Sequence, residues 1–321
     1  MTSGPKVSAI VVNWNGAKEL ESCLPSLLAQ SYRPMEIIVA DNASSDDSAA
    51  VAQRFDVRWV GLDRNWGLAG ALNRGAQAAT GDLVLFLNND MRFHEKFVEY
   101  MVSEIVSDPS IFSVDALQFD WNGENKVHLA TSLARSRVEK LDDPLVPGLF
   151  IRQRDESAST PALMSSAANM LARKAMFVEI GGFDERLPLG YEDVELCWRA
   201  WVRGWKTVYA PAAICWHRVG CSSQSTEGAS IRYRGTLAGR LLTSTKLLPF
   251  NYALQTWLST LAGLARDVLL LKWANVLARL RVLKECVVHL PDLLRERREI
   301  FRAQSTTPAM QLVRLMQILA K

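Results

Sequence analysis

The stretch GDLVLFLNND, residues 81–90, decides the fold that this sequence predicts. Its five consecutive apolar residues, Leu83 to Leu87, are typical of a short strand covered on both faces, as the strands of a parallel sheet are. The polar residues Asn88, Asn89 and Asp90 follow at once. In an open α/β sheet the ligand crevice lies beyond the carboxyl ends of the strands, so this strand is expected to present a carboxylate to a bound ligand.

The polar residues that end this strand could also form only a turn, because Asn and Asp side chains hydrogen-bond their own backbone. Two earlier predicted strands end in the same way, however. Val7 to Val12 is followed by Asn13, and Glu36 to Ala40 is followed by Asp41. Because the carboxyl ends of parallel strands meet at one edge of a sheet, we expect Asn13, Asp41 and Asp90 to converge on one site.

The elements around this strand alternate between strand and helix. Apolar residues at helical spacing from Leu20 to Leu28 predict a first crossover helix, and Val57 to Gly61 predicts a third strand. Strands and helices that alternate at crossover spacing imply parallel strands with right-handed connections. We therefore predict an α/β, Rossmann-like fold with a mainly parallel central sheet. No Gly-x-Gly-x-x-Gly follows the first strand and no P-loop motif is present, which disfavours dehydrogenases and P-loop NTPases.

Charge divides the 321 residues into two regions. Residues 1–231 contain 22 basic and 29 acidic residues and residues 232–321 contain 15 and 5, which gives net charges of −7 and +10. This asymmetry predicts a catalytic domain over residues 1–231 and a basic extension over residues 232–321 that faces an anionic partner. Membrane and nucleic acid are the two candidate partners.

The extension is predicted to form amphipathic basic helices. Leu247 to Ala265 is free of charge but contains Pro249 and Asn251, which argue against a membrane span. Apolar residues then alternate at helical spacing with Arg279, Arg281 and other basic residues. Such helices suit the surface of an anionic membrane better than nucleic acid, so no nucleic-acid partner is expected. The alternative is a helical bundle that packs on the catalytic domain or on a second subunit in a homodimer.

The cysteines and the N-terminal residues indicate where in the cell the protein is located. Five scattered cysteines are an odd number in a chain of this size, which fits a reducing cytosol better than a disulfide framework. The first strand begins by Val7 and no leader pattern precedes it. We expect a cytoplasmic location, with the inner face of the cell membrane as the surface for the extension.

Several motifs, in order along the chain, resemble the signatures of family 2 glycosyltransferases and are most similar to the rhamnosyltransferase-like branch. The resemblance implies a nucleotide-diphospho-sugar transferase (GT-A) fold and covers about residues 7–220. It also implies transfer of a sugar, with rhamnose as a candidate, from a dTDP- or UDP-linked donor to a saccharide or lipid-linked acceptor in cell-surface glycan biosynthesis. The motifs are VVNWNG at 11–16, DNASSD at 41–46, NWG at 65–67, NRG at 73–75, FLNND at 86–90, GGFDE at 181–185 and YEDVELCWR at 191–199.

The resemblance also implies residues for the donor nucleotide. Asp41 would contact the base, and the other predicted donor residues surround the nucleotide and its diphosphate. These residues are Asn13, Asn42, Arg64, Asn65, Asn88 and Asn89.

By the same resemblance Asp90 would hold Mg²⁺ or Mn²⁺, because it aligns with the last carboxylate of the family's Asp-x-Asp motif. Asn88 replaces the first carboxylate, which removes one charge from the site. Mg²⁺ keeps several waters and needs few protein ligands, so one carboxylate with phosphate oxygens can suffice. His217 is a second candidate for a metal ligand or a diphosphate contact, and a structural hydrogen-bonded histidine is the alternative.

The acidic pair Glu192 and Asp193 precedes a predicted helix. Acidic residues favour a first helical turn by about 0.3 to 1 kcal/mol through the helix dipole alone. The family places its general base in this pair, and an acceptor hydroxyl needs a base to take its proton. We predict Asp193 as the base, with Glu192 assisting or binding the acceptor, and inversion through a single displacement.

Two other functions are considered beside transfer. Asn88 in place of a carboxylate is compatible with a non-catalytic, membrane-associated module that only binds sugar nucleotides. A nucleotidyltransferase would share the sheet, but no Gly-rich basic loop follows the first strand. Asp120 to Gly148 has no clear period and is predicted as a long surface loop with short elements, which is a candidate region for acceptor or sugar selectivity.

Overall fold

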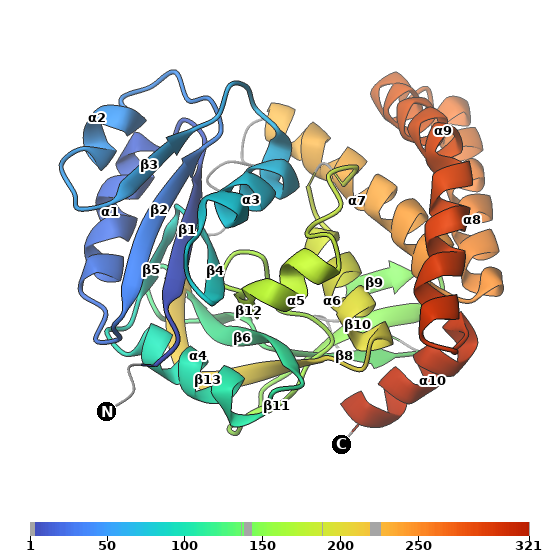
Figure 1. Cartoon of the computed structure of the whole chain (residues 1–321). Helices are drawn as coiled ribbons and strands as arrows, with labels where there is room; N and C mark the ends of the chain where they lie inside the picture. Colours follow the sequence, from blue (N-terminus) through green and yellow to red (C-terminus); the bar gives the residue numbers. More distant parts are fainter. Residues whose placement is uncertain (1–3, 136, 138–142, 188, 219–225, 321) are drawn as a thin grey trace.

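The computed structural model describes residues 4–135, 137, 143–187, 189–218 and 226–320. A twisted central sheet lies between two layers of helices, and a group of long helices lies beside it (Figure 1). The N-terminal strands form one side of the molecule and the helical extension forms the other.

Within the described residues, ten strands form the central sheet and three form a smaller one. The strands of the central sheet are β1 (Val7–Asn13), β2 (Met35–Asp41), β3 (Arg58–Gly61), β4 (Leu83–Asn88), β5 (Met91–Phe93), β6 (Ile111–Asp120), β7 (Lys126–His128), β11 (Thr160–Pro161), β12 (Leu171–Arg173) and β13 (Lys206–His217). The smaller sheet contains β8 (Ala130–Ala134), β9 (Asp143–Val146) and β10 (Leu149–Arg154). The helices are α1 (Ala17–Leu28), α2 (Ser48–Ala52), α3 (Gly67–Ala78), α4 (Phe97–Ser107), α5 (Lys174–Glu179), α6 (Glu192–Val202), α7 (Thr226–Leu247), α8 (Phe250–Leu269), α9 (Trp273–Ala303) and α10 (Pro308–Leu319).

The central sheet is mixed, with the order β11-β13-β6-β12-β4-β1-β2-β3. Its long pairings are parallel: β1 pairs in parallel with β2 and β4, β2 with β3, and β6 with β13. In the described part of this sheet, each antiparallel pairing includes one of the short strands β5, β7, β11 and β12. The predicted α/β class with a mainly parallel sheet is confirmed.

Alternate residues of the N-terminal strands pack on opposite helix layers, as the two-residue repeat of a strand requires. Ala9 and Val11 face the layer that contains α1 and α4. Ile10 faces the opposite layer, which contains α3, α5 and α6. Both faces of the N-terminal strands are therefore packed against apolar residues of the helix layers.

The short elements predicted between Asp120 and Gly148 are strands, and part of this segment is buried rather than on the surface. The described residues of this segment include β7, β8 and β9, and the smaller sheet is antiparallel. Leu145 and Val146 are buried in a cluster with the outer face of α6 and with α10. These partners come from distant parts of the chain, so no local sequence period reveals the strands.

The helical extension consists of α7 to α10, and α7 passes through the predicted boundary after residue 231. Apolar residues of α7 and α9 are buried in one cluster with Leu187, which lies before α6. Across the part of the chain that the structure describes, no helix combines the length and apolar character needed to cross a membrane. Arg279, predicted as a basic border residue, is instead buried, with its Nε 2.8 Å from Oδ2 of Asp267.

Candidate functional site

The carboxyl ends of β1 and β2 lie side by side and are joined by polar side chains. Asn13 and Asp41 are directly opposed in the parallel ladder. The amide nitrogen Nδ2 of Asn13 donates to Oδ1 of Asp41 at 2.8 Å. Oδ1 of Asn13 accepts from Nδ2 of Asn89 at 2.7 Å, which brings in the turn after β4. The structure thus places three predicted donor-site residues in one hydrogen-bonded row.

Close approach at this row depends on a glycine. A Cβ atom at Gly16 would lie 2.1 Å from Nδ2 of Asn89 and 2.7 Å from Oδ1 of Asn13. Any side chain at Gly16 would therefore separate these two amides.

Three non-glycine residues beside the predicted site adopt left-handed backbone conformations. They are Asn15, Ala43 and Tyr191, with φ of 49°, 61° and 72°. For Ala and Tyr this conformation is strained, and such strain concentrates at functional sites. Tyr191 is held there by Arg240 of α7, whose Nε donates to its hydroxyl at 3.0 Å.

Asn42, Arg64 and Asn65 lie in the loops after β2 and β3. Asn42 is buried, its Nδ2 donates to Oδ1 of Asn65 at 2.8 Å, and its Oδ1 accepts from the backbone N–H of Trp66 at 2.7 Å. The Asn42 amide therefore holds the two loops together. Arg64 is exposed, and its guanidinium carbon lies 3.7 Å from the Trp66 ring centre, so Arg64 is free to approach a ligand from this loop.

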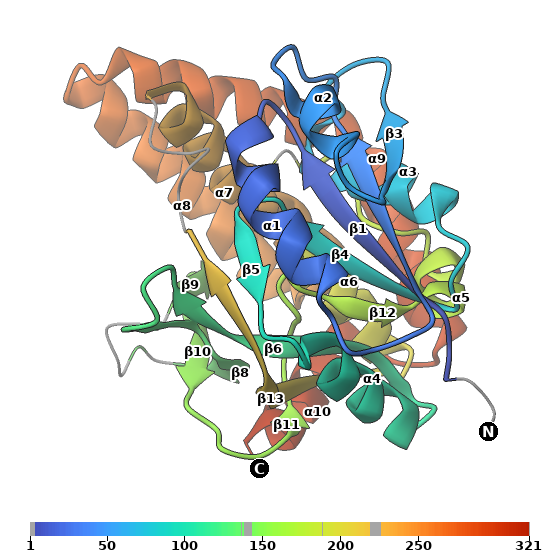
Figure 2. The same ribbon diagram turned by 90° about the vertical axis from the view of Figure 1, so that its left-hand side faces the viewer.

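Asp90 and His217 face each other at the end of β4. β5, which follows Asp90, pairs with β13 and sets Met91 opposite His217, and Figure 2 shows these two strands together. Oδ1 of Asp90 lies 3.1 Å from Nε2 of His217. That oxygen is buried and has no hydrogen-bond partner among the described residues.

These two side chains fit a divalent cation that has few protein ligands. A buried oxygen without a donor is the chemistry that a hard cation satisfies. Within the described residues, no three His, Cys, Asp or Glu side chains are grouped closely enough to hold a metal by themselves. Asp90 and His217 would supply part of the coordination shell, and waters and donor phosphate oxygens would supply the rest.

The acidic pair lies at the first turn of α6. Glu192 is only 5% exposed, and its Oε2 has no hydrogen-bond partner among the described residues. Burial, and then the neighbouring Asp193, raise the pKa of Glu192 to about 8. Asp193 is half-buried, and desolvation raises its pKa as well. A carboxylate that is less exposed to water and has a raised pKa is a stronger base near neutral pH.

A loop between β11 and β12 connects the acidic pair to the end of β4. The backbone N–H of Asn88 donates to the carbonyl oxygen of Ala168 at 3.2 Å. One residue earlier, the N–H of Ala167 donates to Oδ2 of Asp193 at 3.4 Å. The loop thus brings the predicted base next to the strand end that carries Asp90.

Sequence reasoning missed Asp115 and His128, which lie beneath this loop. Asp115 is fully buried in β6, its Oδ1 accepts from the N–H of Ser166 at 3.1 Å, and its Oδ2 lies 2.7 Å from Nε2 of His128. Burial alone would lower the pKa of His128, but Asp115, and more weakly Asp193, raise it. A carboxylate in the middle of an apolar strand was the available signal in the sequence.

Arg218 was also missed. Its backbone N–H donates to the carbonyl oxygen of Asp90 at 2.9 Å, and its guanidinium carbon lies 4.1 Å from the Trp121 ring centre. The backbone of Arg218 is therefore fixed to that of Asp90, and its guanidinium lies over Trp121. Its position directly after His217 was the signal in the sequence.

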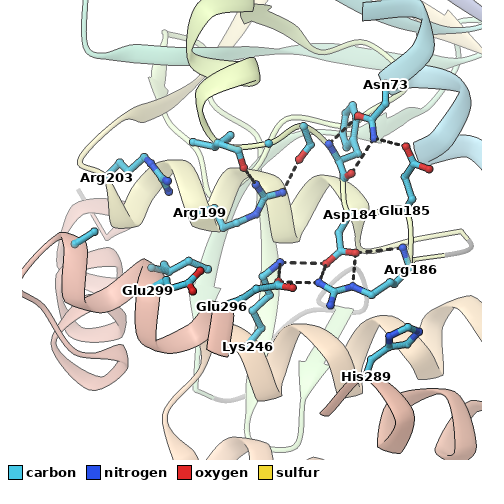
Figure 3. Close-up of a pocket in the computed structure, with 16 residues that line it drawn as sticks. Asn73, Asp184, Glu185, Arg186, Arg199, Arg203, Lys246, His289, Glu296 and Glu299 are labelled. Atoms are coloured by element: carbon cyan, nitrogen blue, oxygen red, sulfur yellow. Dashed lines mark hydrogen bonds and ion pairs between the residues drawn. The ribbon is translucent and has the colours of Figure 1, made fainter. Parts of the chain in front are cut away.

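A cavity of about 910 Å³ lies elsewhere, between α6 and the extension, and none of the predicted site residues lines it. Figure 3 shows that its walls carry a network of ion pairs. Nζ of Lys246, on α7, lies 2.7 Å from Glu195, 2.9 Å from Glu296 and 3.1 Å from Asp184. This network joins α6 to α7 and α9 and is a structural contact between the two regions.

Comparison with known proteins places this geometry among sugar transferases. A family model described as "Glycosyl transferase family 2" matches residues 8–180. The chain is similar to the poly-beta-1,6-N-acetyl-D-glucosamine synthase of Staphylococcus aureus (strain COL), with 25% identity over 214 residues, which are 65% of this chain and 49% of that protein. The chain thus spans about half the length of the curated relatives it matches.

Two solved structures share the fold. One is a complex of GalNAc-T7 with UDP, GalNAc and Mn²⁺, with a TM-score of 0.59 and 17% identity over 78% of this chain and 49% of that chain. The other is the mannosyltransferase PcManGT from Pyrobaculum calidifontis with GDP-Man and Mn²⁺, with a TM-score of 0.58 and 18% identity over 99% of this chain and 87% of that chain. The GT-A fold predicted from the sequence is confirmed.

Proposed function

The chain belongs to glycosyl transferase family 2, and from that premise we propose that it is an inverting enzyme of cell-surface glycan assembly. It transfers a sugar from a nucleotide diphosphate donor, dTDP- or UDP-linked, to a saccharide or lipid-linked acceptor. Rhamnose is the candidate sugar from the sequence resemblance. By its name, the similar protein from Staphylococcus aureus is a synthase of poly-beta-1,6-N-acetyl-D-glucosamine, which supports the assignment to glycan assembly.

One observation carries the proposal: a single loop contacts both the end of β4 and the acidic start of α6. Ala168 accepts from the backbone of Asn88, and Ala167 donates to Asp193. A displacement reaction needs a held leaving group on one side of the reacting carbon and a base on the other. The end of β4 would hold the leaving group, Asp193 would be the base, and one short loop contacts both.

The donor end of the site is assigned to the row at β1, β2 and β4. Asp41 and Asn13 bind the nucleoside, and Asn88 and Asn89 lie near the diphosphate. Asp90 and His217 hold Mg²⁺ or Mn²⁺. When bound, the cation offsets the negative charge that the diphosphate gains as it leaves.

The acceptor end is assigned to the start of α6. Asp193 takes the proton from the acceptor hydroxyl as that oxygen bonds to the anomeric carbon and the diphosphate departs from the opposite face. One such displacement inverts the anomeric configuration. Glu192 is more deeply buried than Asp193, so its part is to assist Asp193 or to bind the acceptor.

The test combines donor binding with turnover. UDP-, dTDP- and GDP-sugars are screened by thermal shift with and without Mn²⁺, and a donor that binds is assayed for transfer and hydrolysis, with the product anomer read by NMR. We expect Asp90→Asn to abolish the effect of Mn²⁺ on donor binding, with Asp47→Asn, an exposed carboxylate, as the control. Unaltered turnover in both Asp90→Asn and Asp193→Asn contradicts these roles. Donor binding without turnover over a broad acceptor panel favours the non-catalytic module.

We also propose that the α8–α9 hairpin docks on an anionic membrane. Four apolar residues at its turn are exposed: Leu269 (82%), Leu270 (55%), Leu271 (69%) and Trp273 (58%). The exposed Arg266 and Lys272 flank them. Exposed apolar surface bordered by basic residues suits an interface with anionic lipid, where each basic residue adds about 1 kcal/mol. This surface would bring the enzyme to a lipid-linked acceptor.

Liposome flotation tests the docking. We expect the wild type to float with phosphatidylglycerol vesicles and not with phosphatidylcholine, and the double variant Leu269→Glu, Trp273→Glu to remain unbound. Val178→Glu is the matched control, because Val178 is 63% exposed but lies on α5 in the catalytic domain. Equal flotation of the double variant overturns the membrane surface. A wild-type dimer that the double variant converts to a monomer, without flotation, assigns the surface to a second subunit.

A further inference from the structure

A row of buried polar side chains leads from His217 into the core of the sheet. Nδ1 of His217 lies 3.1 Å from Oε1 of Gln118 on β6. Gln118 lies next to Asn169, and Asn169 lies next to Asp115. Gln118 is 3% exposed, and Asn169 and Asp115 are fully buried. The mechanism proposed above does not use Gln118 or Asn169.

The orientation of Asn169 follows from its neighbours. One terminal atom of its amide lies 3.2 Å from the carbonyl oxygen of Ser166 and 3.1 Å from Oδ1 of Asp115. The carbonyl oxygen can only accept, and Oδ1 of Asp115 already accepts from the N–H of Ser166. The Asn169 atom between them must therefore be the NH₂ group. Its oxygen then faces Nε2 of Gln118 at 3.2 Å.

The orientation of Asn169 determines the orientation of the Gln118 amide and then the tautomer of His217. Because Nε2 of Gln118 donates to Asn169, the other terminal atom of Gln118, facing His217, is the oxygen. An oxygen accepts, so Nδ1 of His217 carries the hydrogen. In the neutral imidazole the second ring nitrogen, Nε2, is then left with a lone pair.

That lone pair points toward another acceptor. Nε2 of His217 lies 3.1 Å from Oδ1 of Asp90, and this oxygen has no donor among the described residues. If this row of hydrogen bonds had only a structural role, we would expect a donor to face Oδ1 of Asp90. A buried acceptor without a donor costs stability. Nε2 of His217 and Oδ1 of Asp90 each present a lone pair to the other, and a cation can bind between two such atoms.

We propose that Asn169 and Gln118 are positioning residues that hold His217 in the tautomer whose Nε2 can bind a divalent cation together with Asp90. The inference rests on the proposed function in one respect, that a cation binds at Asp90. Asp115 anchors the far end of the row. Because Asp115 also contacts the loop that bears on Asp193, the metal ligand and the base are held by one buried framework.

Direct metal binding tests the proposal without turnover. Gln118→Met keeps the length of the side chain and removes its acceptor, and Gln30→Met is the matched control, because Gln30 is equally buried at 3% but lies at the end of α1. Mn²⁺ binding is measured by calorimetry with and without UDP. We expect Gln118→Met to weaken Mn²⁺ binding about 10- to 100-fold, as loss of a partner behind a metal ligand does, and Gln30→Met to leave it unchanged.

The tautomer itself is read by ¹⁵N NMR of the histidine side chains in metal-free protein. We expect His217 to carry hydrogen on Nδ1 in the wild type and to lose this preference in Gln118→Met. Mn²⁺ affinity in Gln118→Met within twofold of the wild type, or hydrogen on Nε2 of His217 in the wild type, overturns the positioning role alone. Failure of the wild type to bind Mn²⁺ with or without UDP overturns the metal assignment in the proposed function and this inference with it.

Discussion

Helix α6 carries two buried glutamates one turn apart, and their surroundings are opposite. Glu192, at its start, has an oxygen without a partner among the described residues, and burial with Asp193 raises its pKa to about 8. Glu195 is also buried, which alone would raise its pKa, but Arg199 and Lys246 lower it. Oε2 of Glu195 lies 2.6 Å from Arg199 and Oε1 lies 2.7 Å from Lys246.

The two glutamates represent two regions of the molecule. Around Glu192 and Asp90 the fold leaves buried acceptors without donors, which is costly unless a ligand completes them. Around Glu195 the charges of α6, α7 and α9 neutralise one another. Among the described residues, buried carboxyl oxygens without partners therefore mark the side of α6 that faces the proposed site, and paired charges mark the side that joins the extension.

The largest effect is expected at Asp193. Asp193→Asn removes the proposed base, so we expect turnover to fall about 10²- to 10⁴-fold. Because burial raises the pKa of Asp193, the fold favours its neutral form, and the unfolding temperature should not fall. Initial rates and a thermal melt measure both quantities. A large loss of stability with little loss of rate would assign Asp193 to structure.

A smaller effect, on stability, is expected at Glu195. Glu195→Gln leaves Arg199 and Lys246 with fewer partners in a buried network, and breaking such a network costs about 3 kcal/mol or more. Urea unfolding at pH 7.5 measures the change. If the variant is as stable as the wild type, the network does not hold the extension to the catalytic domain.

Glu192→Gln should change stability in the opposite direction from Glu195→Gln, and the size of the change should depend on pH. The folded protein keeps a proton on Glu192 up to about pH 8, whereas an ordinary glutamate loses it near 4.5, so wild-type stability falls as pH rises through this range. We expect the variant to be more stable than the wild type by about 1 kcal/mol or more at pH 8.5 and equal to it at pH 4. Melts at these pH values measure this, and a difference independent of pH contradicts the raised pKa.

The smallest effect is expected for an exposed ion pair on α9. Arg295 lies 2.7 Å from Asp292, and both side chains are well exposed to solvent. Because solvent screens such pairs, Arg295→Ala should change stability by no more than about 0.5 kcal/mol. The same urea experiment provides the comparison with Glu195→Gln. A loss similar to that of Glu195→Gln would mean that burial does not separate the two kinds of pair.

The strand ends show how much of the structure can be predicted from residues that are neighbours in the sequence. Apolar runs that end in Asn13, Asp41 and Asn88 predict strands and their direction, because strand formation and termination depend on neighbouring residues. The parallel arrangement then follows from the crossover lengths. The roles of Asp41, Asp90 and Asp193 in the site stay predictions, although the contacts described here are compatible with them.

Other features depend on residues that are distant in the chain. Asp115 and His128 meet because β7 folds back on β6, and Lys246 meets Asp184 across 62 positions of sequence. Tyr191 is held in its left-handed conformation beside Gly239 of α7, where a Cβ atom would lie 2.6 Å from the tyrosine side chain. No periodic pattern or fixed spacing in the sequence predicts these contacts.

The sequence by itself determined the α/β class, the polar ends of the strands and the basic, amphipathic character of the extension, since each depends on the order of apolar and polar residues over a few turns or strands. Only the tertiary structure decided which buried charges are paired. Glu192 and Glu195 are the same residue on the same helix. Their difference arises because Arg199 of α6 and Lys246 of α7 pair with Glu195, whereas Oε2 of Glu192 has no hydrogen-bond partner among the described residues.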